Sequence, residues 1–330
     1  MKRLFVAFLL FSILCSCALS ETLVTNGGVS LDPAVLPYCT DDPDVPVVYF
    51  ISDISPEALV AAYEALGAKL PGKVGVKMST GESERSNYLR PWLIADLIHL
   101  LNGTIVECNT AYGGSRASTA MHRQQAKDNG LLDVAELDIL DEEGSMGIPI
   151  EGGVRISVDY VGSHFKNYDS YLVLSHFKGH AMAGFGGAIK NISIGFGSSK
   201  GKVWIHSGGT KTSGSIWGQQ DPFLEAMADA AKGVNTYMGG NILYISVLNC
   251  LSVDCDCDGN PAEPDMHDIG ILASTDPLAI DQAAIDLVYA MPDSGSLIRR
   301  IERQNGLYVL EVGQRNGLGS RRYNLVILDD

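Results

Sequence analysis

The sequence is short of positive charge. Its 330 residues contain 24 Lys and Arg against 39 Asp and Glu, which gives a formal net charge of −15 at pH 7. A chain this acidic is repelled by phosphate backbones, so we expect no nucleic-acid partner. Internal repeats and low-complexity segments are also missing, and 46% of the residues are hydrophobic. This composition is typical of a globular protein with a substantial core.

The apolar run at the N-terminus, residues 4–14, is too short to span a bilayer. It follows Lys2 and Arg3, so we expect residues 1–20 to be a signal peptide that exports the protein to the bacterial cell envelope. Residues 18–20 suit an ordinary signal peptidase, whereas residues 14–17 resemble a lipobox in which Cys17 would carry lipid. The position of Cys17 slightly favours the lipobox. Membrane contact is then expected only through such an anchor.

Cysteine is sparse. Removal of the signal leaves five cysteines, an odd number that cannot all pair internally. These five are Cys39, Cys108, Cys250, Cys255 and Cys257. A disulfide between Cys255 and Cys257 would close a strained small ring. Their spacing is better suited to two thiolates on one soft metal ion.

Residues 21–46 are rich in Pro, Asp and Gly, so we expect a tether followed by a surface lead-in. From residue 47 onward, apolar runs of strand length alternate with helical patterns. Predicted strands cover 47–51, 73–78, 103–108, 154–161, 171–175, 241–248, 268–273 and the C-terminal tail. Predicted helices begin after Ser55, cover 87–101, 118–129 and 221–232, and begin again at 275–277.

This alternation predicts a single α/β domain over residues 47–330. We expect a mixed, largely parallel sheet with helices on both faces, plus a short antiparallel strand pair. Ligands of such sheets bind beyond the carboxyl ends of the strands. The loops that begin at Ser79, Asn109 and His176 should therefore face one cleft.

Several polar side chains follow the predicted strands. Lys77, Lys178 and His176 are candidate catalytic residues, because a strand-end loop can bring imidazole and ammonium groups to one point. A basic pocket for a carboxylate or phosphate would be built from a larger set. That set is Lys77, Glu82, Arg90, Asn109, Tyr112, Arg116 and Lys190. The alternative is ordinary salt bridging between these cations and Glu82, Glu84 or Glu107.

The glycine-rich stretch 184–202 lacks a complete nucleotide-binding motif, because Ile189 and Val203 stand where a motif needs Gly and Ser or Thr. A close crossing of backbones is a better interpretation than an anion nest. The metal-site prediction joins Cys255 and Cys257 to His180 and His206, and the expected ion is a divalent metal such as zinc or iron.

The motifs appear in an order that resembles a known family. They include "VGVKMSTGE", "ECNTAYGGSRASTAMHRQQAKDNG", "LSHFKGHAMAGFGGAIKNISIGFGSSKGK", "CDCDGN" and "DIGILASTDPLAIDQAAIDLV". The chain resembles domain of unknown function family 362, whose members are often labelled iron–sulfur centre proteins. Many members carry a ferredoxin-like insert, but the matching interval here, residues 207–222, contains no cysteine. Ferredoxin-type clusters are therefore not expected.

Two functions fit these residues. The first is an exported metal-binding protein, with or without catalysis, that takes up a small anionic substrate in a cleft at the strand ends. The second is a non-catalytic module that binds a small anion and uses its cysteines structurally. The sequence does not indicate an oligomeric state.

Overall fold

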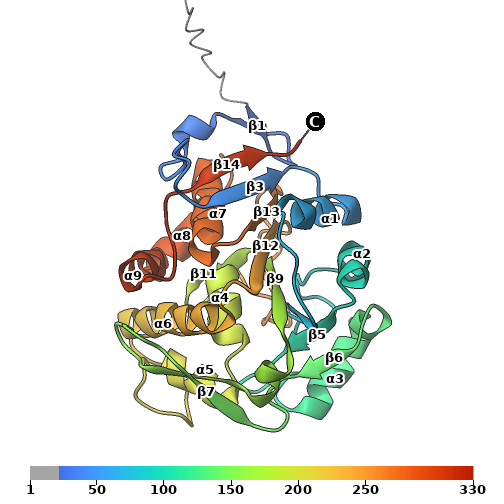
Figure 1. Cartoon of the computed structure of the whole chain (residues 1–330), viewed down its shortest axis with the longest axis vertical. Helices are drawn as coiled ribbons and strands as arrows, with labels where there is room; N and C mark the ends of the chain where they lie inside the picture. The colour runs from blue at the N-terminus through green and yellow to red at the C-terminus, as the bar shows by residue number, and fades with distance from the viewer. Residues whose placement is uncertain (1–21, 330) are drawn as a thin grey trace, which may run out of the picture.

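The parallel sheet predicted from the sequence is the centre of the computed structural model, which describes residues 22–329 (Figure 1). Eight strands pair in the order β14-β3-β13-β12-β9-β4-β5-β6. β13 is antiparallel to both its neighbours, and all the other pairs in this sheet are parallel. The strands are β3 (Val47–Ile51), β4 (Val74–Lys77), β5 (Thr104–Glu107), β6 (Leu137–Ile139), β9 (Ser170–His176), β12 (Ile242–Leu248), β13 (Gly270–Ser274) and β14 (Asn324–Ile327).

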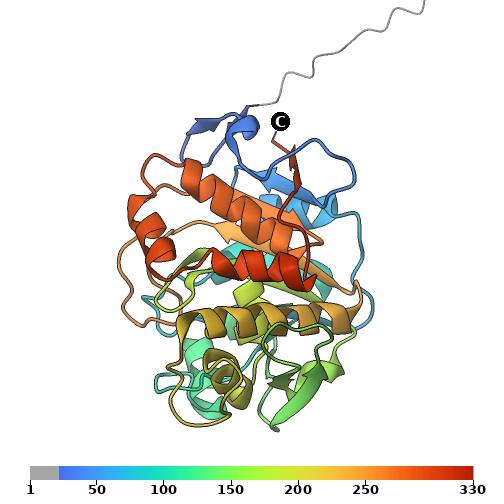
Figure 2. The ribbon, with the colours of Figure 1, turned by 90° about the vertical axis from the view of Figure 1, so that its left-hand side faces the viewer.

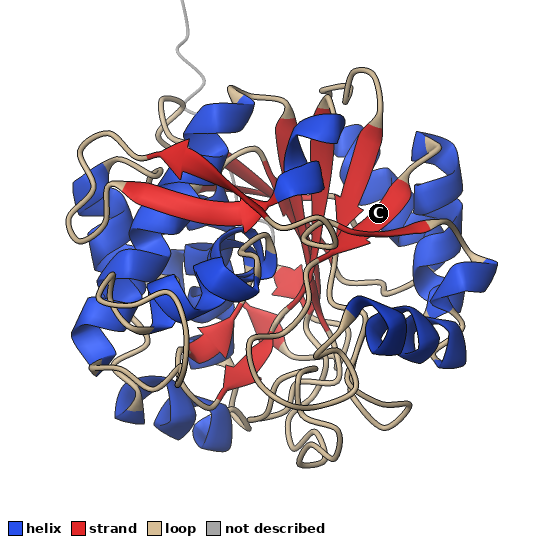
Figure 3. Ribbon diagram, turned by 90° about the horizontal axis from the view of Figure 1, so that it is seen from below, coloured by secondary structure: helices blue, strands red, loops and turns tan. Residues whose placement is uncertain are grey.

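Helices cover both faces of this sheet, as predicted (Figure 3). One face carries α1 (Pro56–Ala65), α2 (Pro91–Leu101) and α3 (Thr119–Asp128). The other carries α6 (Gln220–Met238), α7 (Pro277–Ala290) and α9 (Tyr308–Asn316), which lie side by side in Figure 2. Along β12, Tyr244 and Leu248 face the second helix layer, while Ile245 and Val247 face the first. A strand covered on both sides must be apolar on both sides, which explains its continuous apolar run.

Two of the helix starts predicted from the sequence are capped as expected. The Ser55 side chain accepts a hydrogen bond from the backbone N–H of Ala58 and caps α1. The Asp276 carboxylate caps α7 in the same way. The helix predicted over 87–101 begins only at Pro91, because proline is suited to the first helical position.

Shorter elements surround the sheet, and several were not predicted. They are α4 (Ala188–Lys190), the π-helical turn η4 (Asn191–Gly195), α5 (Ser199–His206), α8 (Gly295–Arg303) and the 3-10 turns η1 (Pro33–Val35), η2 (Leu131–Asp133) and η3 (Ser163–Asn167). Antiparallel pairs are formed by β1 (Leu23–Val24) with β2 (Ser30–Leu31), β7 (Ser145–Pro149) with β8 (Val158–Gly162), and β10 (Lys178–His180) with β11 (Gly184–Gly186).

The strand predicted over residues 154–161 is shorter in the structure. The backbone N–H groups of Val154, Arg155 and Ile156 donate to the carboxylate of Asp229 on α6 instead of to a neighbouring strand. This contact bridges more than seventy residues of sequence. A local alternation pattern therefore could not reveal it.

The segment predicted to be a tether packs against the domain within the described residues. Leu23 is fully buried, Leu36 is almost fully buried, and the backbone N–H of Tyr38 donates to Asp286 on α7. The predicted signal peptide and Cys17 lie outside the described residues. Between residues 22 and 329, no helix has both the length and the apolar character needed to cross a membrane.

Candidate functional site

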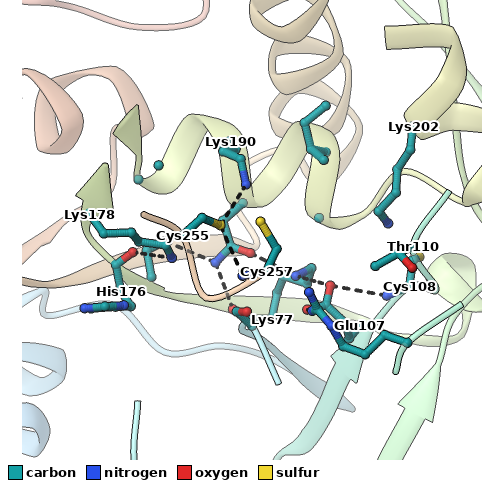
Figure 4. Close-up of a pocket in the computed structure, with 18 of the residues that line it drawn as sticks. Lys77, Glu107, Cys108, Thr110, His176, Lys178, Lys190, Lys202, Cys255 and Cys257 are labelled. Carbon is teal, nitrogen blue, oxygen red and sulfur yellow. Dashed lines mark hydrogen bonds and ion pairs between the residues drawn. The ribbon is translucent and has the colours of Figure 1, made fainter. Parts of the chain in front are cut away.

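A cavity of about 70 Å³, partly open to solvent, lies at the carboxyl ends of the central strands (Figure 4). β4 ends at Lys77, β5 at Glu107 and β9 at His176, and these strands are parallel neighbours, so their last residues meet at one edge. The loop after β12 and the turn of α4 and η4 complete the wall. We call this space the basic cavity, because the residues that line it include Lys77, Arg116, Lys178, Lys190 and Lys202.

One part of this lining is a closed ion-pair network. The Nζ of Lys77 donates to Met78 O at 3.2 Å, to Glu107 Oε1 at 2.9 Å and to Asn191 Oδ1 at 2.9 Å. The Arg116 guanidinium lies 3.6 Å from the other oxygen of Glu107. Burial alone would raise the pKa of Glu107, but the positive charges of Lys77 and Arg116 outweigh it and lower the pKa to about 2. Salt bridging, the alternative left open by the sequence, is therefore what Lys77 does.

A second network joins His176 and Lys178 to Asp256, the residue between the two cysteines. Asp256 accepts from His176 Nδ1 at 2.7 Å and from Lys178 Nζ at 2.8 Å. Burial would raise the pKa of Asp256, but the charges of Lys178 and His176 hold it well below its usual range. The His176 ring also contacts Asn249 O at 2.6 Å. These contacts fix the loop that carries the cysteines onto the end of β9.

The structure brings together three of the four predicted metal ligands. Ligand atoms of His180, Cys255 and Cys257 all lie within 4.8 Å of one another, and we call these residues the cysteine cluster. The Sγ of Cys255 lies 3.8 Å from Lys190 Nζ and 3.4 Å from the backbone N of Cys257. Hydrogen bonding to Cys257 lowers the pKa of Cys255 well below its usual value; burial opposes this, and the charges of Lys190 and His180 add to it. Cys255 is thus set up to be a thiolate, the form that binds metal.

His180 is oriented by the backbone. Its Nδ1 accepts hydrogen bonds from the N–H groups of Met182, at 3.2 Å, and Ala183, at 2.9 Å. A neutral imidazole that accepts at Nδ1 carries its proton on Nε2. Ligation of a metal at Nε2 therefore requires that proton to move to Nδ1 and both backbone hydrogen bonds to open. The two sulfurs are the donors that need no such rearrangement.

The fourth predicted ligand, His206, is not part of the cysteine cluster. Its Nδ1 lies 2.7 Å from Lys202 O, one turn earlier in α5, and its ring stacks on Phe223 with centroids 4.8 Å apart. Burial lowers its pKa to about 3. A local helical contact and an aromatic partner hold the His206 ring outside the cysteine cluster, and its role as a ligand stays a prediction.

Three predicted anion-binding residues, Glu82, Arg90 and Asn109, are absent from the lining of the cavity. Arg90 donates to Glu84 O and Ser86 O and lies over the Tyr88 ring. Asn109 donates to Thr119 Oγ1 and contacts His122. Both side chains hold loops in place. Tyr112, Arg116 and Lys190 do line the basic cavity, whereas Glu82 accepts hydrogen bonds from Ser115 and Arg116.

Lys202 lines the cavity but was not among the predicted site residues. The sequence feature that could have indicated Lys202 is its position after Gly197 and Gly201. That glycine-rich stretch does not match a nucleotide-binding motif, so it gave no site prediction. In the same stretch, the N–H groups of Ala188 and Ile189 donate to Asp281. That part of the glycine-rich segment therefore binds a carboxylate of the protein itself.

A second cavity of about 370 Å³ also borders the cysteine cluster. Cys255, Cys257 and Tyr112 line both cavities. The charged residues of the second cavity are Glu82, Asp254 and Asp258, so we call it the acidic cavity. The two thiols thus line both a space that contains five cationic side chains and a space whose charged side chains are carboxylates.

The model of the family described as domain of unknown function (DUF362) matches residues 74–286, which is more than half of the chain. The chain therefore belongs to this family, and the resemblance seen in its motifs is confirmed. Among curated proteins, none matches the sequence.

Two solved structures are similar to this chain. The lactate racemase apoprotein from Thermoanaerobacterium thermosaccharolyticum is 14% identical, with a TM-score of 0.45, and the match covers 82% of this chain and 62% of that one. A Thermotoga maritima protein is 12% identical, with a TM-score of 0.39, over 79% of this chain and 58% of that one. The chain thus spans less than two thirds of each of these proteins.

Proposed function

We propose that the protein holds a soft divalent metal ion at the cysteine cluster and takes up a small anionic molecule in the adjoining basic cavity. One observation carries the proposal: two thiols and an imidazole converge within 4.8 Å at the wall of a cavity lined by cations. Thiolate and imidazole donors suit zinc or iron, whereas magnesium and calcium prefer oxygen. The two thiolates, joined by His180 once its proton has moved and its two backbone hydrogen bonds have opened, would leave a coordination position open, as in catalytic zinc sites.

Elemental analysis of anaerobically purified protein tests the metal. The wild type should contain about one zinc or iron per chain, and the double variant Cys255→Ser, Cys257→Ser should contain almost none. Cys250→Ser is the matched control, because Cys250 is exposed, lies five positions from Cys255 and is outside the cluster. A substoichiometric wild type with an unchanged double variant would refute the metal site.

The second candidate function is a binding module for a small anion without metal or catalysis. The cationic lining of the basic cavity favours it independently of the cysteines. A thermal-shift series with phosphates and carboxylates, run with and without chelator, separates the two candidates. Stabilisation that survives chelation supports the binding module, and stabilisation that needs the metal supports the first candidate.

Export is also part of our proposal. It is supported by the basic and apolar pattern of residues 1–20. Intact-mass measurement of protein secreted with its own N-terminus distinguishes the two cleavage sites. A lipidated chain that begins at Cys17 supports the anchor, whereas a chain that begins after Ser20 supports ordinary cleavage. An uncleaved product would contradict both.

A further inference from the structure

The lysines of the basic cavity differ in how many of their hydrogen-bond donors are in use. A lysine ammonium has three N–H groups and no acceptor. Lys77 has an acceptor for each of them, namely Met78 O, Glu107 and Asn191. This side chain has no donor left for a ligand.

Lys202 is the opposite case. Its side chain is 6% exposed, and its Nζ donates to one acceptor, Gly197 O, at 2.6 Å. Among the residues that the structure describes, no carboxylate lies within ion-pair distance of it, and Glu107 is already held by Lys77 and Arg116. Two of its three N–H groups are therefore without a protein acceptor at a cavity wall.

The N-terminal end of helix α5 adds to the positive potential around the Lys202 ammonium. Lys202 lies in the first turn of α5, where the helix dipole is positive and disfavours a cation. A buried ammonium in such a place is unfavourable unless an anion approaches it. Lys190, on α4, also has unused hydrogen-bond donors. Within residues 22–329, the hydrogen-bond partner of its Nζ is the Cys255 sulfur, at 3.8 Å.

We propose that Lys202 anchors an oxyanion group, a carboxylate or a phosphate, of the molecule bound in the basic cavity. The remainder of that molecule extends toward Lys190 and the cysteine cluster. Figure 4 shows Lys202 at the end of the cavity away from His176 and Lys178, with Cys257 between Lys202 and Cys255. The inference rests on the proposed uptake of an anion and assigns the residue that recognises its charge.

Binding of inorganic phosphate and of oxalate to the full chain tests the anchor. Both are titrated calorimetrically in chelator at constant ionic strength, so that a metal ion cannot bind them. The wild type should bind at least one of them, and Lys202→Met should weaken that binding at least about tenfold, because charge-assisted hydrogen bonds are lost. Lys200→Met is the matched control: this lysine is exposed on the same helix and should bind within about twofold of wild type, because surface charges contribute little.

The outcomes separate this inference from the proposed function. A wild type that binds neither probe in chelator, nor when the titration is repeated without chelator, overturns both the anchor and the uptake of an anion. A wild type that binds while Lys202→Met binds equally well overturns only the anchor. Preference for phosphate or for oxalate identifies which oxyanion the cavity accepts.

A second measurement uses the wild type alone and so does not depend on the folding of a variant. Reductive methylation labels accessible amines, and mass spectrometry reports the extent at each lysine. The bound probe should protect Lys202 and Lys190 and leave exposed Lys200 unchanged. Equal labelling of Lys202 with and without a saturating probe would overturn the anchor.

Discussion

Lys77 and Lys202 line the same cavity, yet the structure uses them differently. Both are buried, at 1% and 6% exposure. Lys77 gives each of its donors to the protein, whereas Lys202 gives one to a backbone carbonyl. This difference shows that burial and a place in the cavity wall do not by themselves identify a lysine that binds a ligand. The number of donors left without a protein acceptor separates a lysine that supports the fold from one that can hold a ligand.

Replacement of Lys77 is expected to have the largest effect on the stability of the protein. Lys77→Met should lower the free energy of unfolding by about 3–5 kcal/mol, because it removes one partner of a buried ion pair and leaves Glu107 beside Arg116 alone. Urea unfolding measures it, with exposed Lys69→Met as the control. A variant as stable as wild type would remove the distinction between the two lysines.

Asp159 extends the comparison to a buried carboxylate. Its side chain is fully buried, Oδ2 has no hydrogen-bond partner among the described residues, and burial raises its pKa to about 7. A folded pKa above the unfolded value means that its contribution to stability is present below pH 4 and is lost as the pH rises through 7.

Asp159→Asn should therefore be more stable than wild type at pH 8, by roughly 1–3 kcal/mol, and equally stable at pH 4. Urea unfolding at the two pH values tests the change, and exposed Asp44→Asn should show no such pH-dependent gain. A gain that is the same at both pH values would show that ionisation of Asp159 is not its cause.

The smallest effect on stability is expected at Lys202. Without a bound anion, Lys202→Met should change the free energy of unfolding by less than about 1 kcal/mol, or raise it, because no buried carboxylate loses its partner. Thermal unfolding in chloride buffer without phosphate gives the value. A loss as large as that of Lys77→Met would mean that Lys202 also supports the fold.

The sequence predicted the fold well where local signals decide it. The strand and helix alternation, the caps at Ser55 and Asp276 and the antiparallel pair element are all in the structure. Helices α8 and α9 were missed, because neither has a capping side chain or a proline at its start. The burial of Leu23 and Leu36 in the segment expected to be a tether and lead-in is not revealed by a composition rich in Pro, Asp and Gly.

The site was predictable in its residue types but not in their roles. Strand ends pointed to Lys77, His176 and Lys178, and the Cys-x-Cys spacing pointed to the cysteine cluster. Whether a lysine has free donors depends on acceptors far away in the sequence, such as Asn191, which is 114 residues from Lys77. That information arises only when the chain folds, and so Lys202 was overlooked.

The most direct test of this account is an anomalous difference map from crystals of the wild-type protein soaked in selenate. Selenate is an oxyanion with an anomalous signal and a size close to that of phosphate. We predict a selenium peak in the basic cavity, with a selenate oxygen about 3 Å from Lys202 Nζ and none in contact with Lys77. A cavity without selenium, or a selenate held by Lys77 with Lys202 uncontacted, would contradict the account.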